Sequence, residues 1–317
     1  MIKGPVNHAN QLSPQLQFAV FIGLSVGTVF LFYFIGLGII TALYGKGLIE
    51  QLYRQDFSGQ RMAQALYLLQ IISTTVPIFI APVIFARFIV KEPAAYLKSG
   101  VKFPWVLMVI VFFVMISSLA LIELLSNLNQ QMLLPKWLSG VEQWMKKSEN
   151  QAQALTKAIL KMDNVLDMLK NVLLVGLLTA IAEEFMFRGA LQTIMQRWTK
   201  NTHGAVWITA AIFSAFHMEF YGFLPRMLLG ALFGYFVAFS GSIWPAVWGH
   251  FINNGLAVLA TYLFEHKKIK VNPDDTHTFT YGSYVFSAII IIILLLVYKN
   301  ITSSKKQAVN INGEGLG

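Results

Sequence analysis

Long apolar runs separated by polar segments dominate the pattern of hydrophobic and polar positions along the chain. A helix needs about 20 apolar residues to cross the hydrocarbon core of a bilayer. Eight runs approach or exceed this length, at residues 17–44, 63–90, 104–126, 171–193, 204–219, 223–240, 243–264 and 283–298. The fifth run is short, so we expect a tilted or partly re-entrant helix there. The pattern predicts an all-α, polytopic membrane helical bundle with about eight transmembrane helices.

The composition agrees with this fold class and limits which classes of partner the protein can have. Of 317 residues, 56% are hydrophobic and only 12% are charged, about half the share usual in soluble domains. The net charge of +9 suits a membrane protein, because Lys and Arg flank the spans and meet anionic headgroups. No basic face with interleaved aromatic residues is present, so we expect membrane lipids and no nucleic acid as partners. The absence of cysteine excludes disulfides, thiol nucleophiles and zinc–cysteine sites.

We expect one transmembrane helical domain over residues 1–300, interrupted by a polar segment at 128–170. The second half of that segment has apolar residues spaced by three or four, namely Leu155, Ile159, Met162, Leu166 and Leu169. This spacing predicts an amphipathic helix on the membrane surface or capping the bundle, with an ordinary packed connecting helix as the alternative. The tail at 301–317 is polar and rich in Gly and Asn, which predicts disorder.

Three charged residues lie close together inside the fourth apolar run: Glu183, Glu184 and Arg188. A charge at the bilayer centre costs about 2.5–3.5 kcal/mol on insertion scales, and such residues usually face a protein interior or a wet cavity. Residues four apart share a helix face, so the spacing predicts an ion pair between Glu184 and Arg188. Glu183 points about 100° away and would keep a free carboxylate for proton transfer. The alternative is that all three residues form one structural network.

Two later runs add further polar groups to this predicted site inside the bundle. The fifth contains His217, one helical turn after Phe213, and the seventh contains His250 and Asn254, four apart and therefore on one face. An imidazole and an amide aimed at one point are suitable donors for a developing oxyanion. The alternative role is interhelical hydrogen bonding, which such residues commonly provide in membranes. Gly230 and Gly234, in the sixth run, have the G-x-x-x-G spacing that predicts close helix packing.

The motifs E-E-x-x-x-R at 183–188, F-x-x-x-H at 213–217 and H-x-x-x-N at 250–254 occur in order on successive late spans. Together they resemble the CPBP family of intramembrane proteases. That family includes the type II CAAX prenyl endopeptidases and bacterial relatives linked to bacteriocin processing and abortive infection. The resemblance covers about 172–260, so we expect a catalytic core at 171–264.

The resemblance implies a role for each motif residue. Glu183 matches the glutamate that activates the attacking water, assisted by His217. His250 and Asn254 match the pair that stabilises the tetrahedral oxyanion. The supporting positions, whose roles are less defined, are Glu184, Arg188 and Phe213, and the phenylalanine is expected to shape the cavity.

The resemblance therefore implies an intramembrane endopeptidase that cleaves membrane-associated proteins or peptides, with or without a lipid, by glutamate-activated water. The alternatives are a non-catalytic immunity or scaffold protein and a proton-coupled transporter. We expect no cofactor, although Glu183, His217 and His250 are also residue types that ligate zinc; H-E-x-x-H is absent. We expect a multi-pass protein of a bacterial plasma membrane with both termini inside, and the sequence leaves the substrate and the oligomeric state open.

Overall fold

The computed structural model describes residues 12–57, 60–132, 134–273, 275 and 277–314, and within these ranges the chain forms helices and no strand. The first membrane helix is α1 (Pro14–Tyr44), followed by the short α2 (Lys46–Tyr53). The second combines α3 (Gln60–Leu69) and α4 (Val76–Ile84) with two π-helical segments, Gln70–Thr75 and Phe85–Val90. The short α5 (Pro93–Tyr96) precedes α6 (Val106–Gln130).

After α7 (Ser139–Ile159), the fourth membrane helix consists of α8 (Val165–Asn171), α9 (Thr179–Glu184) and α10 (Gln192–Thr199) with π-helical segments between them. It is followed by α11 (Thr202–Phe216), α12 (Phe223–Ser240), α13 (Trp244–Glu265) and α14 (Tyr281–Glu314). An all-α bundle is therefore confirmed.

Six stretches in the described part of the chain are long and apolar enough to cross a membrane: Pro14–Tyr44, Arg61–Val90, Val106–Gln130, Val165–Thr199, Phe220–Ser240 and Tyr281–Ser304. Each of the eight predicted runs is mainly helical, but the count of eight transmembrane helices is not confirmed. The fifth run forms a helix of only 15 residues, Thr202–Phe216. The seventh forms the 22-residue α13, which carries polar groups such as His250, Asn253 and Asn254 and is not among the six. The chain is an integral, multi-pass membrane protein.

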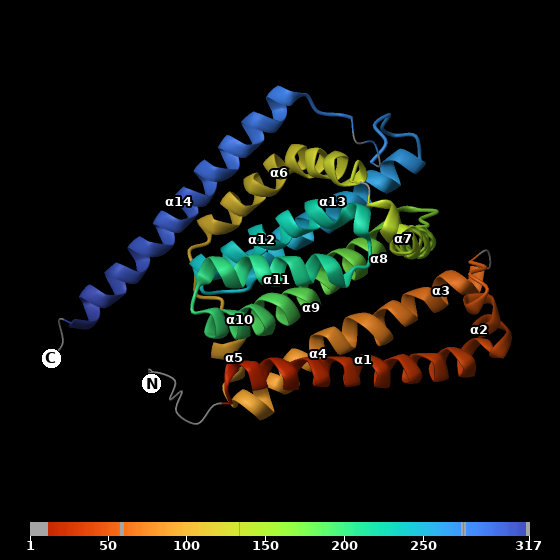
Figure 1. The fold of residues 1–317 in the computed structure, drawn as a ribbon, viewed down its shortest axis with the longest axis horizontal. Helices are drawn as coiled ribbons and strands as arrows, with labels where there is room; N and C mark the ends of the chain where they lie inside the picture. Colours follow the sequence, from red (N-terminus) through yellow and green to blue (C-terminus); the bar gives the residue numbers. More distant parts are fainter. Residues whose placement is uncertain (1–11, 58–59, 133, 274, 276, 315–317) are drawn as a thin grey trace.

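The helices are arranged around the segment that carries the glutamates (Figure 1). The α1–α4 hairpin packs on one side of α9 and α10, and α14 packs along α6 on the other side of the bundle. Between them lie α11, α12 and α13, with α11 and α12 in extensive mutual contact. The beginning of α1 and the end of α14 lie at the same end of the bundle (Figure 1).

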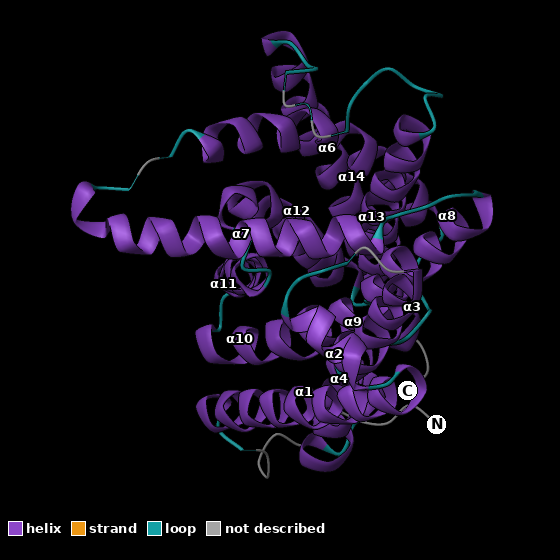
Figure 2. Cartoon of the chain, turned by 90° about the vertical axis from the view of Figure 1, so that its right-hand side faces the viewer, coloured by secondary structure: helices purple, strands orange, loops and turns teal. Residues whose placement is uncertain are grey.

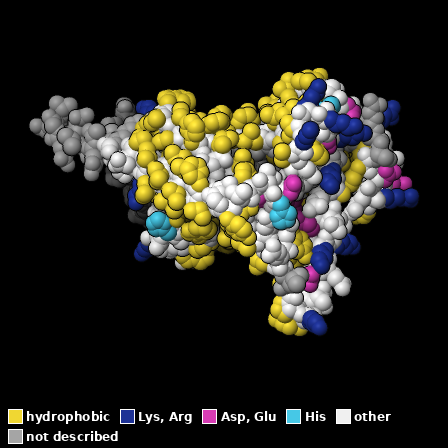
Figure 3. All heavy atoms as spheres, turned by 90° about the horizontal axis from the view of Figure 1, so that it is seen from above, with side chains coloured by type: hydrophobic (Ala, Val, Ile, Leu, Met, Phe, Trp, Pro, Cys, Tyr) yellow, Lys and Arg dark blue, Asp and Glu magenta, His cyan; other side chains and the backbone are white. Residues whose placement is uncertain are grey.

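The surface distinguishes membrane-facing and water-facing regions. Large apolar side chains are exposed along α1, α6 and α14, including Phe34 at 65%, Phe113 at 53% and Ile292 at 58%. Figure 3 shows hydrophobic side chains over much of one face, whereas charged side chains gather toward the end where Figure 1 places α7. Exposed apolar patches of this extent are typical of a lipid-facing surface.

The 128–170 segment differs from the predicted single amphipathic helix. α7 ends at Ile159, whose carbonyl accepts hydrogen bonds from Tyr67 Oη (3.0 Å) and Asn171 Nδ2 (3.3 Å). A new helix starts at Val165, where Asn164 caps it by accepting from the Asp167 backbone N–H (3.1 Å). The prediction of one helix through Leu155–Leu169 is therefore wrong, because side-chain bonds to backbone groups break it between Leu160 and Asn164.

α7 runs across the end of the bundle: it is seen end-on in Figure 1 and along its length in Figure 2. It packs against α3 and against the short turn Phe220–Gly222 that joins α11 to α12. These contacts favour the packed connecting helix over a helix lying freely on the membrane surface.

Disorder was predicted for the polar tail at 301–317, but α14 continues as helix to Glu314. The hydroxyls of Thr302, Ser303 and Ser304 bond to carbonyls three or four residues earlier, at 2.8–3.0 Å, which is compatible with continued helix. The structure thus describes helix as far as Glu314, residues 315–317 lie outside the described part of the chain, and the disorder of the tail stays a prediction.

Candidate active site

The two glutamates lie on a short α-helical piece between two π-helical segments, Val172–Leu178 and Phe185–Leu191. π-Helical turns are wider than α-helical ones and occur frequently at functional sites. Residues 172–191 contain no proline, so the sequence did not indicate this widening. All seven residues of Phe185–Leu191 are buried, so this part of the fourth membrane helix is enclosed by protein.

Glu184, Arg188 and His250 form a buried hydrogen-bonded cluster. Glu184 Oε1 accepts from Arg188 Nη1 (3.0 Å) and lies 2.9 Å from His250 Nδ1. Glu184 and Arg188 are 0% exposed and His250 is 4% exposed. The ion pair predicted from the four-residue spacing is confirmed. The contact between Glu184 and His250 joins two helices through residues that are 66 positions apart in sequence.

The guanidinium of Arg188 also binds the backbone of α12. Arg188 Nη2 donates to the Gly230 carbonyl (3.0 Å), and one turn later Gln192 Nε2 donates to the Gly234 carbonyl (3.0 Å). A Cβ at Gly230 would lie 3.1 Å from Ala210 Cα, and one at Gly234 would lie 2.9 Å from a Val206 methyl carbon. Glycine therefore lets α11 pack closely while the two carbonyls remain within reach of the fourth membrane helix.

Glu183 faces both histidines. Its Oε2 lies 3.9 Å from His217 Nε2 and 3.8 Å from His250 Nε2, and within the described residues it has no hydrogen-bond partner although it is buried. These separations exceed the range of direct hydrogen bonds. They leave a polar gap bounded by one carboxylate oxygen and two ring nitrogens, which is a suitable environment for a bridging water.

The hydrogen bonds of the Nδ1 atoms determine the tautomer of both imidazole rings. His217 Nδ1 lies 2.9 Å from the Phe213 carbonyl, and His250 Nδ1 lies 2.9 Å from Glu184 Oε1. A carbonyl and an ion-paired carboxylate accept hydrogen bonds, so each Nδ1 carries the proton. In a neutral ring the Nε2 lone pair then points toward Glu183.

The charges of this cluster nearly cancel. Glu183 and Glu184 supply two negative charges and Arg188 one positive charge. A buried, uncompensated charge is costly, so one additional proton on Glu183, His217 or His250 would bring the cluster to neutrality. An arrangement that holds one proton between a carboxylate and two imidazoles is suited to general acid–base chemistry.

Asn254 is placed differently from the other three predicted catalytic residues. Its Nδ2 donates to the Val175 carbonyl (3.1 Å), and its Oδ1 accepts from Asn253 Nδ2 (3.1 Å). Among the described residues, its side chain makes no hydrogen bond to Glu183, His217 or His250. The structure thus brings Glu183 and the two histidines together, and holds Asn254 one turn along α13 with one amide N–H uncommitted.

Aromatic rings surround the histidines. Phe213 packs edge-on against His217 (5.0 Å between centroids) and His250 (5.9 Å), and its face lies 4.4 Å from the Arg188 guanidinium carbon. Phe233 stacks on His250 at 5.0 Å with an interplanar angle of 15°. Phe213 therefore contacts both imidazole rings and the guanidinium. Phe233 was not identified from the sequence, because only the packing of α12 on α13 reveals its position.

His217 is more accessible than predicted. It is the C-cap residue that follows α11, and its side chain is 27% exposed. The next residue, Met218, has a left-handed backbone (φ 57°) that turns the chain. Glu219 and Arg226 then form an ion pair across this turn, a contact that spacing did not predict.

The donor types at this site suit zinc, but their spacing does not. Tetrahedral zinc with bonds of about 2.0–2.1 Å needs ligand atoms roughly 3.4 Å apart. Here Glu183 Oε2 lies 3.8 and 3.9 Å from the two Nε2 atoms. No group of three His, Asp or Glu side chains in the described ranges is placed to hold a metal ion. We therefore derive no chemical step through a metal.

Comparison with known proteins gives one result. Residues 166–256, from within α8 to within α13, match the family described as Rce1-like, type II CAAX prenyl endopeptidase. No curated protein and no solved structure gives a significant match to the chain. The matched segment contains Glu183, Glu184, Arg188, His217, His250 and Asn254. Through this segment, which contains every motif of the buried cluster, the chain is similar to the Rce1-like, type II CAAX prenyl endopeptidase family.

Proposed function

We propose that this protein is an intramembrane endopeptidase that hydrolyses peptide bonds of membrane-associated proteins or peptides by means of a glutamate-activated water. The match of residues 166–256 to the Rce1-like family supports a CAAX-protease-like endopeptidase. The observation that carries the proposed chemistry is the convergence of His217 Nε2 and His250 Nε2 on the unpartnered Oε2 of Glu183.

In the first step, a water in the gap transfers a proton to Glu183, and its oxygen attacks the scissile carbonyl carbon. The carbonyl electron pair moves to the oxygen, and a tetrahedral oxyanion forms. Because the N–H of His250 Nδ1 is engaged by Glu184, His250 can donate to the oxyanion from Nε2 only as an imidazolium. This is the state that makes the buried cluster neutral while Glu183 is ionised.

Asn254 supplies the second donor to the oxyanion through its uncommitted amide N–H. The bond to Val175 fixes the orientation of this amide. When the tetrahedral intermediate collapses, the C–N bond breaks and the leaving amine takes the proton from Glu183, directly or through His217. The products are a carboxylic acid and an amine, and the site returns to its starting protonation.

The roles of the supporting residues follow from their contacts. Arg188 forms an ion pair with Glu184, and Glu184 in turn orients His250. Phe213 and Phe233 limit the movement of both rings. We assign the substrate no particular lipid, since the buried cluster acts on a peptide bond whether or not a lipid is attached.

Proteomics of membrane fractions tests the function. Cells with the wild-type protein should accumulate cleaved fragments of membrane-associated proteins, and cells with Glu183→Ala should not. Glu265→Ala, which changes an exposed glutamate at the end of α13, is the matched control and should behave as wild type. A scaffold would keep its phenotype in Glu183→Ala. The activity of the purified protein should persist after metal ions are chelated. A loss of activity that added zinc restores would contradict the metal-free chemistry.

We also propose that the protein resides in a bacterial plasma membrane with both termini in the cytoplasm. The described ends of α1 and α14 lie at one end of the bundle (Figure 1). Because the chain lacks cysteine, single cysteines can be introduced at Ser13 and Ser304 without removing native thiols. Labelling of intact cells with an impermeant reagent should leave both unmodified, and labelling of either from outside would contradict this orientation.

A further inference from the structure

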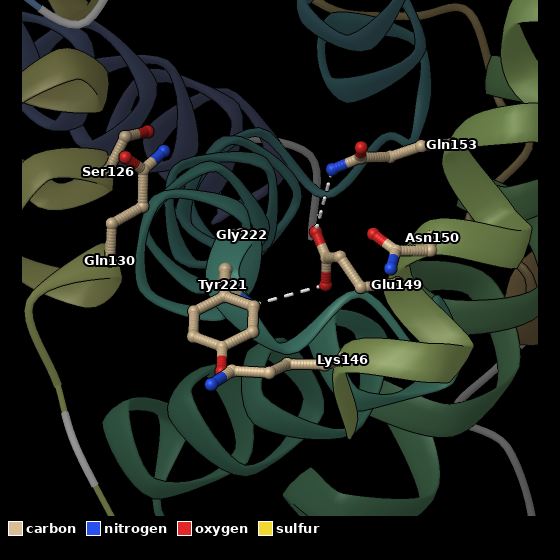
Figure 4. A pocket seen from close by; sticks show the side chains of 8 residues that line it. All are labelled: Ser126, Gln130, Lys146, Glu149, Asn150, Gln153, Tyr221 and Gly222. Carbon is tan, nitrogen blue, oxygen red and sulfur yellow. Dashed lines mark hydrogen bonds between the residues drawn. The ribbon is translucent and has the colours of Figure 1, made fainter. Parts of the chain in front are cut away.

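A polar cavity of about 460 Å³ lies between α6, α7 and the turn that follows α11. We call it the α7 cavity; its lining residues include Ser126, Gln130, Lys146, Glu149, Asn150 and Tyr221. Figure 4 shows Ser126 and Gln130 on one wall and Glu149, Asn150 and Gln153 on the opposite wall. Apart from Tyr221 and Gly222, the residues that line the cavity lie outside the segment that matches the family, and none of them belongs to the cluster of Glu183, Glu184, Arg188 and the two histidines.

The chemistry of these walls favours a neutral polar ligand. The side chains of Ser126, Gln130 and Asn150 make no hydrogen bond to any other described residue. Glu149 is already engaged with the Tyr221 backbone N–H (3.3 Å) and with Gln153 Nε2 (3.4 Å), and Lys146 pairs with Glu142 at 2.7 Å. The cavity therefore offers uncommitted amide donors and acceptors, while Lys146 is ion-paired and Glu149 is hydrogen-bonded to neutral donors. This set of groups matches the alternating N–H and C=O groups of an extended peptide.

The cavity is connected by a short, fixed segment to the catalytic cluster. Tyr221 follows His217 by four residues, so at most about 14 Å of chain separates the two. Asn129 holds the turn between them by donating to the Phe220 carbonyl (3.0 Å) and accepting from the Leu224 N–H (2.7 Å). The ring of Trp144, on α7, packs against Phe220 at 5.2 Å. An extended peptide of about four residues covers this distance.

The α7 cavity is one end of a longer run of cavities. A second polar cavity of about 470 Å³ shares Lys146 and Asn150 with it. That cavity shares Gln55 and Gln151 with a third, of about 550 Å³, between α1, α3 and α7. The third cavity is lined by many apolar side chains, including Val29, Leu66, Leu69 and Leu155. The series along α7 is thus polar at the α7 cavity and largely apolar at its other end.

We propose that this series of cavities binds the substrate polypeptide as an amphiphilic segment. Polar residues near the scissile bond occupy the α7 cavity, and apolar residues occupy the cavity between α1, α3 and α7. The proposal rests on the proposed function and adds a substrate class to it: polypeptides with adjacent polar and apolar segments. Gln130 and Asn150 are the specificity-determining residues.

Peptide binding without cleavage tests this proposal directly. The full-length Glu183→Gln variant is reconstituted in lipid nanodiscs and titrated with a fluorescein-labelled peptide that has a Ser/Gly/Gln segment next to a Leu/Ala segment. Adding Gln130→Ala and Asn150→Ala should raise the dissociation constant about ten- to thirtyfold, because two hydrogen bonds are lost. Thr156→Ala, an exposed change on the same helix outside these cavities, is the matched control and should leave binding unchanged. Thermal unfolding of each variant verifies that the bundle is intact.

A second measurement separates this inference from the proposed function. In the wild-type background, the Gln130/Asn150 double variant should raise KM by the same factor for the amphiphilic peptide and leave kcat unchanged. Equal affinity of the double variant and the Thr156→Ala control would overturn the inference even if the protein cleaves peptides. If the double variant binds the peptide more weakly than the control but the wild type cleaves no peptide, the peptide site would be supported and the proteolytic function contradicted.

Discussion

Breaking the buried ion pair between Glu184 and Arg188 should destabilise the bundle far more than removing the neutral contact one turn away. Arg188 and Gln192 lie on the same face of the fourth membrane helix and are 0% and 2% exposed. Each donates a 3.0 Å hydrogen bond to a glycine carbonyl of α12. They differ in that Arg188 also neutralises Glu184. Substituting each by methionine therefore separates the effect of the charge from that of the carbonyl hydrogen bond.

Magnitudes decide which effect dominates. Removing one partner of a buried ion pair costs about 3–5 kcal/mol, because the remaining charge is left without compensation. An interhelical hydrogen bond in a membrane protein contributes on average about 0.6 kcal/mol and at most about 1.7 kcal/mol. Arg188→Met should thus lower the free energy of unfolding by about 2–4 kcal/mol more than Gln192→Met. Adding Glu184→Gln to Arg188→Met should recover part of the loss, because it removes the uncompensated carboxylate.

Reversible unfolding in mixed detergent micelles, followed by circular dichroism, measures these free energies. The Gln192→Met variant serves as the control for the loss of a buried side chain and of one carbonyl hydrogen bond. Equal losses for the two single variants would refute the reasoning, since the charge of Arg188 would then contribute nothing beyond its hydrogen bond. An additive double variant would likewise show that Glu184 and Arg188 are not energetically coupled.

Three further predictions concern residues around the cluster. Asn254→Ala should lower kcat about 10²–10³-fold with little change in KM, and steady-state cleavage kinetics would contradict the oxyanion role if KM alone changed. Gly234→Val should lower the free energy of unfolding by about 1–3 kcal/mol, because the new side chain overpacks against Val206. Gly27→Val should unfold at the wild-type temperature, because apart from the local helix backbone no atom lies within 4 Å of a new Cβ there. Burial lowers the pKa of Lys98 to about 8. The unfolded chain therefore binds more protons than the folded protein above pH 8, so stability should rise with pH from there to the ordinary lysine range near pH 10.5. The pH dependence of unfolding in Lys98→Met should lack this rise, and an identical profile would contradict the assigned burial.

Local patterns in the sequence predicted the helices and the contacts made along one helix. Apolar runs marked the membrane helices because length and apolarity alone determine whether a segment can cross a bilayer. The Glu184–Arg188 pair followed from a four-residue spacing, and the buried face of Gly230 and Gly234 followed from a similar spacing. These features depend on helix geometry and not on which helices become neighbours.

Contacts between distant segments could not be obtained in this way. The bond of His250 to Glu184 and the stacking of Phe233 on His250 join separate helices, and no spacing encodes them. The break after Ile159 was missed because it depends on hydrogen bonds from Tyr67 and Asn171 to that carbonyl. The apolar periodicity continues through the break, since Met162, within the connection itself, is buried.

The central claim is that Glu183 activates a water for attack on a peptide bond, and single-turnover cleavage in oxygen-18-labelled water tests it most directly. Excess wild-type protein in liposomes is mixed with a peptide substrate, and the new carboxyl group is analysed by mass spectrometry. Direct attack by water predicts that the first-turnover product carries solvent oxygen, and that Glu183→Gln yields no product. A first-turnover product with unlabelled oxygen would show that a protein carboxylate attacked instead, and full activity of Glu183→Gln would remove Glu183 from the chemistry.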